Sequence, residues 1–71
     1  MKPSLGRIVL FHGVNSNDAI EHPAVITRVW KDEDVNLAVF LDNGSLINRS
    51  NIIQDEKMKQ EIGWRWPPVV K

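Results

Sequence analysis

The sequence predicts a small all-β domain with five strands closed into a barrel, and three observations support this prediction. First, the chain has only 71 residues, which is enough for one domain with a single core. Second, short runs rich in β-branched and aromatic residues alternate with turns rich in Gly, Asn, Asp and Pro, which is typical of strands joined by loops. Third, Asp42-Asn43-Gly44 contains the Asn-Gly pair that favours a type I′ hairpin turn. We therefore expect residues 1–71 to form one β-barrel domain.

The first half of the chain contains two predicted strands separated by a long connection. Residues 7–12 and residues 24–30 are short runs of β-branched and aromatic side chains, as expected for strands. Residues 13–23 are rich in Gly, Asn, Ser and Asp, and we expect a loop of about ten residues there. Strict alternation along the second strand would place four side chains on one face: Ala24, Ile26, Arg28 and Trp30.

The second half of the chain contains three more predicted strands. Residues 35–41 form the third strand, residues 45–48 pair back across the Asn-Gly turn as the fourth, and residues 51–53 continue it or turn a corner. Residues 55–62 are polar and carry opposite charges at i,i+4 spacing, so we expect one or two helical turns. Residues 64–66 form a last short strand with both indoles on one face, and the two prolines that follow end it.

This order of elements resembles a small SH3-like barrel. It has a strand, a long loop, three strands joined by tight turns, a short helical turn and a last strand. A five-stranded OB-type barrel is the alternative, but that fold normally needs more residues. Because SH3-like barrels host many unrelated functions, the predicted fold does not indicate an activity.

The composition argues against several classes of protein. Nine Lys and Arg balance nine Asp and Glu, and this zero net charge argues against a protein that binds nucleic acid through a basic excess. The chain has no cysteine, which excludes disulfides and thiolate metal sites. No apolar run approaches the ~20 residues of a membrane span or the roughly 7–15 of a signal peptide. We therefore expect a cytoplasmic protein that makes no contact with membranes.

Both ends of the chain resemble a family of small bacteriophage-encoded proteins. Residues 3–11 read PSLGRIVLF, which is similar to the family's opening PSVGRIV followed by aromatic or histidine residues. Residues 63–67 read GWRWP, which is similar to the family's ending GTWHWP without the threonine. Residues 24–30 and 37–40 fit the family's second and third strands. The resemblance implies a phage or prophage accessory protein in the cytoplasm of a bacterial host, and it implies no reaction.

No pattern in the sequence indicates catalysis. His12 and His22 could each pair with a carboxylate, but no serine lies in a nucleophile elbow and no histidine spacing suits a metal ion. The four glycines are scattered, so the chain has no phosphate-binding loop. The acidic run at residues 32–34 is more typical of a solvated turn than of a cation site. We predict a protein that is not an enzyme and that has no metal or other cofactor.

Aromatic and arginine residues indicate ligand binding instead. The chain has three tryptophans, and an indole offers a flat stacking surface while an arginine offers a planar fork for phosphate or carboxylate. We predict a site for a small nucleotide-type anion formed by six residues: Trp64, Arg65, Trp66, Arg7, Arg28 and His12. In the alternative interpretation, the paired tryptophans close the barrel core and the arginines cover apolar surface with their stems.

Several strands carry apolar residues on both faces, which predicts self-association. A small barrel buries one face of each strand, so a homodimer or homotetramer with pockets between subunits would cover the other. We therefore expect an anti-defence protein that acts as a homo-oligomeric sponge for a host immune signal, such as a cyclic oligonucleotide or an ADP-ribose derivative. The alternative is a module that binds and inhibits a host protein through residues 13–23 and an exposed strand edge.

Overall fold

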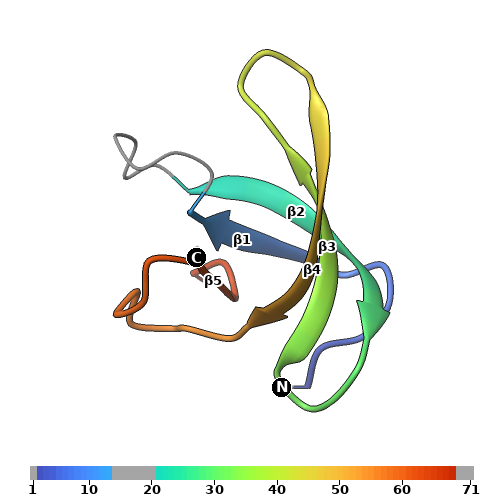
Figure 1. Cartoon of the computed structure of the whole chain (residues 1–71), viewed down its shortest axis with the longest axis vertical. Helices are drawn as coiled ribbons and strands as arrows, with labels where there is room; N and C mark the ends of the chain where they lie inside the picture. The colour runs from blue at the N-terminus through green and yellow to red at the C-terminus, as the bar shows by residue number, and fades with distance from the viewer. Residues whose placement is uncertain (1, 14–20, 69–71) are drawn as a thin grey trace.

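The computed structural model describes residues 2–13 and 21–68, which form one five-stranded antiparallel sheet curled into a half-barrel (Figure 1). The strand order across the sheet is β4-β3-β2-β1-β5. The strands have these bounds: β1 Ile8–His12, β2 His22–Val29, β3 Asp34–Phe40, β4 Leu46–Ile53 and β5 Gly63–Arg65. The all-β prediction is therefore confirmed, with five strands at the expected places. Most of the loop expected at residues 13–23 lies outside the described residues.

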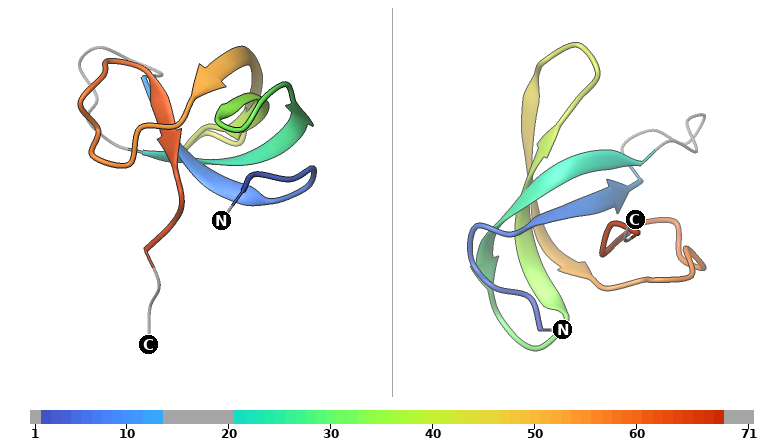
Figure 2. Two further views of the ribbon diagram at one scale, coloured as in Figure 1. Left: turned by 90° about the horizontal axis from the view of Figure 1, so that it is seen from below. Right: turned by 180° about the vertical axis from the view of Figure 1, so that it is seen from behind.

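The curl of the sheet brings its two edge strands near each other at one end (Figure 2). Beyond β4, Gln54 forms a single parallel bridge to Trp64 in β5. The backbone N–H of Asp55 also donates to the Trp64 carbonyl oxygen, at 2.7 Å. Over residues 46–51, by contrast, no strand of the described chain pairs with the outer edge of β4. The half-barrel is therefore fastened at one end and open along the rest of this edge.

The hairpin predicted at Asp42-Asn43-Gly44 joins β3 to β4, but its turn is not of type I′. A type I′ turn needs positive φ at both central residues, whereas here only Gly44 has it, at +86°. The N–H of Leu41 donates to the Ser45 carbonyl oxygen at 2.8 Å, and the Asn43 side-chain oxygen accepts from the Ser45 N–H at 2.9 Å. The loop therefore has three residues, and its last residue is the left-handed glycine.

The short helix expected at residues 55–62 does not form. The Asp55 carboxylate accepts hydrogen bonds from the backbone N–H groups of Lys59 and Gln60, at 2.9 and 2.8 Å. These bonds hold the segment in a loop, and the positive φ of Met58, 55°, is incompatible with a continuing right-handed helix. The aspartate that was expected to pair with the Lys59 ammonium thus binds the backbone instead.

The described residues contain no helix with the length and apolar character needed to cross a membrane.

The concave face of the sheet holds the hydrophobic core. Over residues 2–13 and 21–68, Trp64 is the largest fully buried side chain, and its Nε1–H donates to the Glu33 carbonyl oxygen at 3.0 Å. Its ring also makes an edge-to-face contact with Trp66, with 5.3 Å between ring centroids. The other core residues come from β1 to β4: Val9, Phe11, Ala24, Ile26, Val35, Leu37, Val39 and Ile52. The last strand therefore pairs with β1 along its three residues and also contributes one large indole to the core.

Two β-bulges interrupt the alternation of the strands. In β2, Ile26 pairs with Leu37 and Arg28 pairs with Asn36, so β2 carries one extra residue between these pairs. This residue moves Arg28 from the buried face to the outer face. The expectation that Arg28 and Trp30 share the face of Ile26 is therefore wrong. The second bulge lies in β4, which carries one extra residue between Arg49, the partner of Leu37, and Ile52, the partner of Val35.

We expect Trp64→Ala to unfold the domain. Replacing a buried Trp with Ala costs about 3–5 kcal/mol, and the core of a domain this small rarely supplies more than about that amount. Circular dichroism and urea unfolding at 25 °C would show loss of the cooperative transition.

Trp30→Ala is the matched control, because it removes the same side chain from an exposed position. Trp30 is 46% exposed, so we expect a loss of about 1 kcal/mol or less. A folded Trp64→Ala variant with nearly native stability would contradict the central role of this indole.

Candidate functional site

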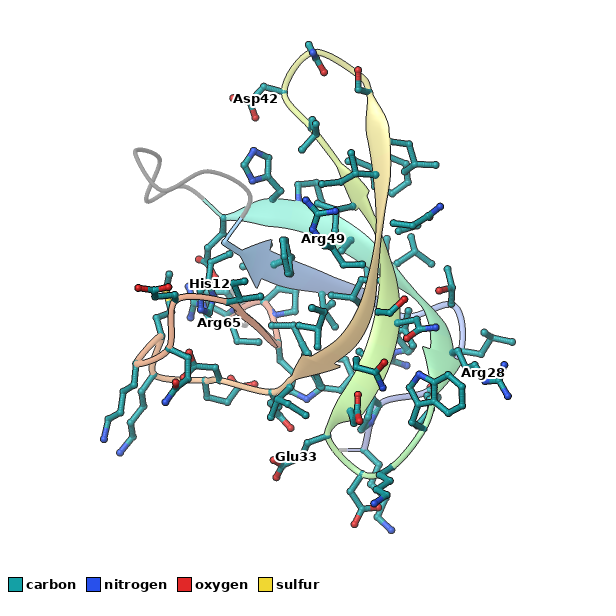
Figure 3. All side chains as sticks on the ribbon, in the orientation of Figure 1. His12, Arg28, Glu33, Asp42, Arg49 and Arg65 are labelled. Atoms are coloured by element: carbon teal, nitrogen blue, oxygen red, sulfur yellow. The ribbon has the colours of Figure 1, made fainter. Side chains whose placement is uncertain are left out.

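The six predicted site residues do not converge on one place. Figure 3 shows His12 and Arg65 on one side of the half-barrel and Arg28 on the opposite side. Of the remaining predicted residues, Arg7 lies over the Trp66 ring, and Trp66 contacts Trp64. The prediction therefore separates into a group near β1 and β5 and a second location around Arg28.

Arg65 is committed to an internal ion pair. Its Nε and a terminal nitrogen donate to the two carboxylate oxygens of Glu21, at 2.6 and 2.7 Å. The hydrogen bond from Arg65 lowers the pKa of Glu21, although partial burial acts in the opposite direction. The same bond raises the pKa of Arg65 above its ordinary value. An anionic ligand would have to displace Glu21 to reach this guanidinium.

His12 fastens the segment between β4 and β5. It is buried, and its Nε2 lies 3.2 Å from Asp55 Oδ2 and 3.1 Å from the Gln60 carbonyl oxygen. A Cβ on Gly63 would lie 2.6 Å from Asp55 Cβ and 3.1 Å from His12 Cε1, so this packing is tight. Backbone N–H groups of Gln60 and Lys59, together with His12, lower the pKa of the Asp55 carboxyl. These contacts give His12 a structural role.

The tryptophans beside Arg65 offer little surface for stacking. Trp64 is fully buried, so its ring belongs to the core, as in the alternative interpretation. Trp66 is half-buried against that core, and its backbone N–H donates to Glu56 Oε2 at 3.0 Å. The guanidinium of Arg7 lies over the Trp66 ring, 5.7 Å from its centroid. The side chains of residues 64–66 therefore mainly contact other residues of the chain, and little of their surface is left for a ligand.

A different constellation has the properties that the sequence prediction assigned to that element. The guanidinium carbon of Arg28 lies 4.0 Å from the ring centroid of the exposed Trp30. The Trp30 Nε1–H donates to Asn36 Oδ1 at 2.8 Å, and the Asn51 backbone N–H donates to the same oxygen at 3.0 Å. We call these four residues, Arg28, Trp30, Asn36 and Asn51, the Arg28–Trp30 platform.

Both β-bulges position the platform. The extra residue in β2 turns Arg28 outward beside Asn36, and the extra residue in β4 brings the Asn51 N–H to the Asn36 side chain. Asn51 has φ 56°, a left-handed conformation that asparagine tolerates better than most residues. The backbone N–H of Trp30 is also held, by the Asp34 carbonyl oxygen at 2.8 Å. The exposed indole is therefore fixed at its ring nitrogen and at its backbone.

Arg28 differs from Arg65 in its charge environment. Within the part of the chain that the structure describes, no carboxylate lies within ion-pair distance of Arg28. By contrast, two guanidinium nitrogens of Arg65 donate to Glu21. A guanidinium without an acidic partner can donate two parallel hydrogen bonds to a phosphate or carboxylate. Arg28 lies over one face of Trp30, yet 46% of this residue stays exposed, and the exposed part of the indole can stack on a planar ring. The platform can therefore hold a ligand that combines an aromatic ring with an anionic group.

The described residues show no metal centre. No group of three or more His, Asp or Glu side chains gathers there in an arrangement that could hold a metal ion. Among the residues that the structure describes, His22 contacts one acid, with its Nε2 at 3.3 Å from Oδ1 of the exposed Asp42. This contact ties the start of β2 to the hairpin between β3 and β4.

Comparisons with protein-family models, with curated proteins and with solved structures found no significant match to this chain. These comparisons therefore indicate neither a family nor a function.

The sequence prediction found Arg28 but missed the other three residues of the platform. Strict alternation placed Trp30 on one face with Ala24, Ile26 and Arg28, and Trp30 was not included in the predicted site. Asn51 carried one available signal, since asparagine is disfavoured in strands and tolerates positive φ, which is typical of a bulge. Asn36 gave no signal that distinguishes it from any polar residue on an outer face.

We expect the stability that Asp55 contributes to disappear in acid. Its folded pKa lies below the ordinary value of 3.8, so the ionised carboxylate stabilises the fold above that pH. This contribution is lost as the pH falls through the lowered folded value. Urea unfolding of the wild type and of Asp55→Asn, from about pH 7 to about pH 2.5, should show a stability gap that closes in acid.

Asp32→Asn is the control for this measurement, because Asp32 lies in an exposed turn. Its stability should follow that of the wild type at every pH. A gap between the wild type and Asp55→Asn that stays constant over the whole range would contradict an electrostatic role for Asp55.

Proposed function

We propose that this chain is a non-catalytic binding protein that captures a small nucleotide-type anion and acts as a homo-oligomer. The Arg28–Trp30 platform is the observation that carries this proposal. It combines an exposed, fixed indole with a guanidinium that has no carboxylate partner among the described residues. A nucleotide has the two matching groups, a flat base and a phosphate.

The energetics favour a small ligand of this kind. Stacking of a base on an aromatic side chain contributes about 1–3 kcal/mol, and a charge-assisted pair with arginine adds to it. Because the indole is already fixed by Asn36, little conformational entropy is lost when a ligand stacks on it. A long nucleic acid would need many more basic groups, and the zero net charge disfavours it.

The resemblance to small phage proteins supports a role in counteracting host defence. A sponge that sequesters a cyclic oligonucleotide or an ADP-ribose derivative needs tight binding and no turnover. The two His–Asp contacts are consistent with such a protein, since each fastens a loop or hairpin. In this proposal, the platform binds the base and a phosphate of the immune signal.

We also propose that the half-barrel belongs to the SH3-like class. The strand order β4-β3-β2-β1-β5 supports this, with the long connection between β1 and β2 and a tight hairpin between β3 and β4. Such barrels carry many different sites, so the assignment adds nothing to the choice of ligand.

One observation favours the alternative function, a module that inhibits a host protein. Over residues 46–51, the outer edge of β4 pairs with no strand of the described chain. An open groove lies beside the end of β4 and the following segment, lined in part by the exposed Ile53 and Ile62. An extended peptide of a partner could add to such an edge.

We expect Trp30→Ala to weaken nucleotide binding about 10- to 100-fold, because the stacking surface is lost. Arg28→Lys should weaken it about tenfold, since an ammonium offers neither the planar fork nor the stack. Isothermal titration calorimetry would use ADP-ribose, a cyclic dinucleotide and a cyclic trinucleotide as probes. Adenosine and ribose 5-phosphate would separate the contributions of base and phosphate.

Arg49→Lys is the matched control for Arg28→Lys. Arg49 is exposed and also has no carboxylate partner in the described part of the chain, but it lies on β4 away from any indole contact. Its variant should bind like the wild type. The proposal fails if the wild type binds none of these nucleotides, or if Trp30→Ala and Arg28→Lys bind as tightly as Arg49→Lys.

A further inference from the structure

The outer face of the sheet is apolar across four strands. Three cross-strand pairs form one row of outward residues from β1 to β4, which runs Ile8, Val25, Ala38 and Asn48. Two further pairs lie beside this row, Leu10 with Pro23 and Phe40 with Leu46. We call the set formed by these pairs the outer face: Ile8, Leu10, Pro23, Val25, Ala38, Phe40, Leu46 and Asn48. Three of its large hydrophobic residues are exposed, Ile8 by 60%, Phe40 by 44% and Leu46 by 56%.

The outer face carries no charged residue, although 25% of the chain is charged. Charged groups lie at its borders. Arg65 pairs with Leu10 at one side but is neutralised by Glu21, and Arg28 lies beyond Val25 along β2. A largely apolar area without charges is typical of the centre of an interface, where charged residues are depleted.

We propose that a second copy of this chain covers the outer face in a two-fold symmetric dimer. In such a dimer the same patch meets itself, so any charge near the axis would face its own image and be repelled. The outer face satisfies this constraint because its eight residues carry no charge, and the two arginines on the same side of the sheet, Arg65 and Arg28, lie at its borders. The outer face contains no Lys or Arg that could attract a nucleic acid or an acidic membrane surface.

This inference deepens the proposed homo-oligomer by naming the interface, and it also places the ligand site. Arg28 and Asn36 pair with each other and lie just beyond Val25 and Ala38 on the same side of the sheet. Two sheets packed face to face lie about 10 Å apart. The platform of each copy would therefore lie at the rim of the interface, where the partner can cover the exposed indole.

The experiment compares the mass in solution of the wild type, Phe40→Glu and Ser45→Glu. Native mass spectrometry and light scattering would be recorded over a range of protein concentrations. We expect a dimer for the wild type and for Ser45→Glu, which adds the same charge in the exposed hairpin outside the outer face. Phe40→Glu should weaken dimerisation at least tenfold, because two like charges would be brought into an apolar interface.

Circular dichroism would show that Phe40→Glu keeps the sheet, as expected for a residue whose side chain lies outside the core. Leu46→Lys, on the strand paired beside Phe40, repeats the test with the opposite charge. Either a monomeric wild type or a dimer that is unaffected by both variants would overturn the inference. A monomeric wild type that binds phospholipid vesicles or a host protein through this face would assign it to another occupant and would also overturn it.

The same samples separate this inference from the proposed ligand. A wild-type dimer that binds no nucleotide would contradict the proposed ligand and leave the interface supported. A wild-type monomer that binds ADP-ribose or a cyclic nucleotide would contradict the interface and leave the ligand supported.

Discussion

The burial of Trp64 is the interaction on which the rest of the fold depends. A chain of 71 residues without cysteine has no disulfide to close its core. Trp64 does this from a strand of only three residues, through its ring in the core, its Nε1–H on Glu33 and its carbonyl oxygen on Asp55. These bonds reach the β2–β3 turn and the end of β4, so one residue connects both edges of the sheet. The loop that follows β4 can then be held by His12 and Asp55 rather than by a helix.

The two β-bulges interrupt the regular strand pairing and thereby position the platform. Each gives up one position of the ladder, and together they bring Arg28, Asn36 and Asn51 to the same part of the outer surface. Asn36 Oδ1 accepts from both the indole and the β4 backbone, so the orientation of Trp30 depends on the bulge in β4. An exposed tryptophan gains little stability from this arrangement, because about half of its surface stays in water. A rigid exposed ring is useful chiefly when another molecule stacks on it.

The strands could be predicted from sequence because β-branched runs and turn residues act locally. The bulge in β2 could not, since one extra residue leaves no mark in an alternating pattern that is only eight residues long. The bulge in β4 left one signal, Asn51, in an otherwise regular strand. The helix prediction failed at Asp55, where i,i+4 charges suggested a side-chain pair and the carboxylate bound backbone N–H groups instead. The prediction of a site at Arg65 failed to include Glu21, which lies 44 positions away in sequence. Only the folded chain shows that Arg65 is paired with Glu21 and that Arg28 has no carboxylate partner among the residues described.

If a second copy covers the outer face, ligand binding at the platform and dimerisation are coupled. A ligand that contacts both copies at the rim would bind the dimer more tightly than the monomer, and by linkage it would strengthen the dimer to the same extent. Such coupling suits a protein that must retain a small signal, because release would require the interface to loosen as well as the stack to break. It also explains how a domain with a small core could gain stability in use, since every ligand that binds only the assembled state shifts the folding equilibrium toward it.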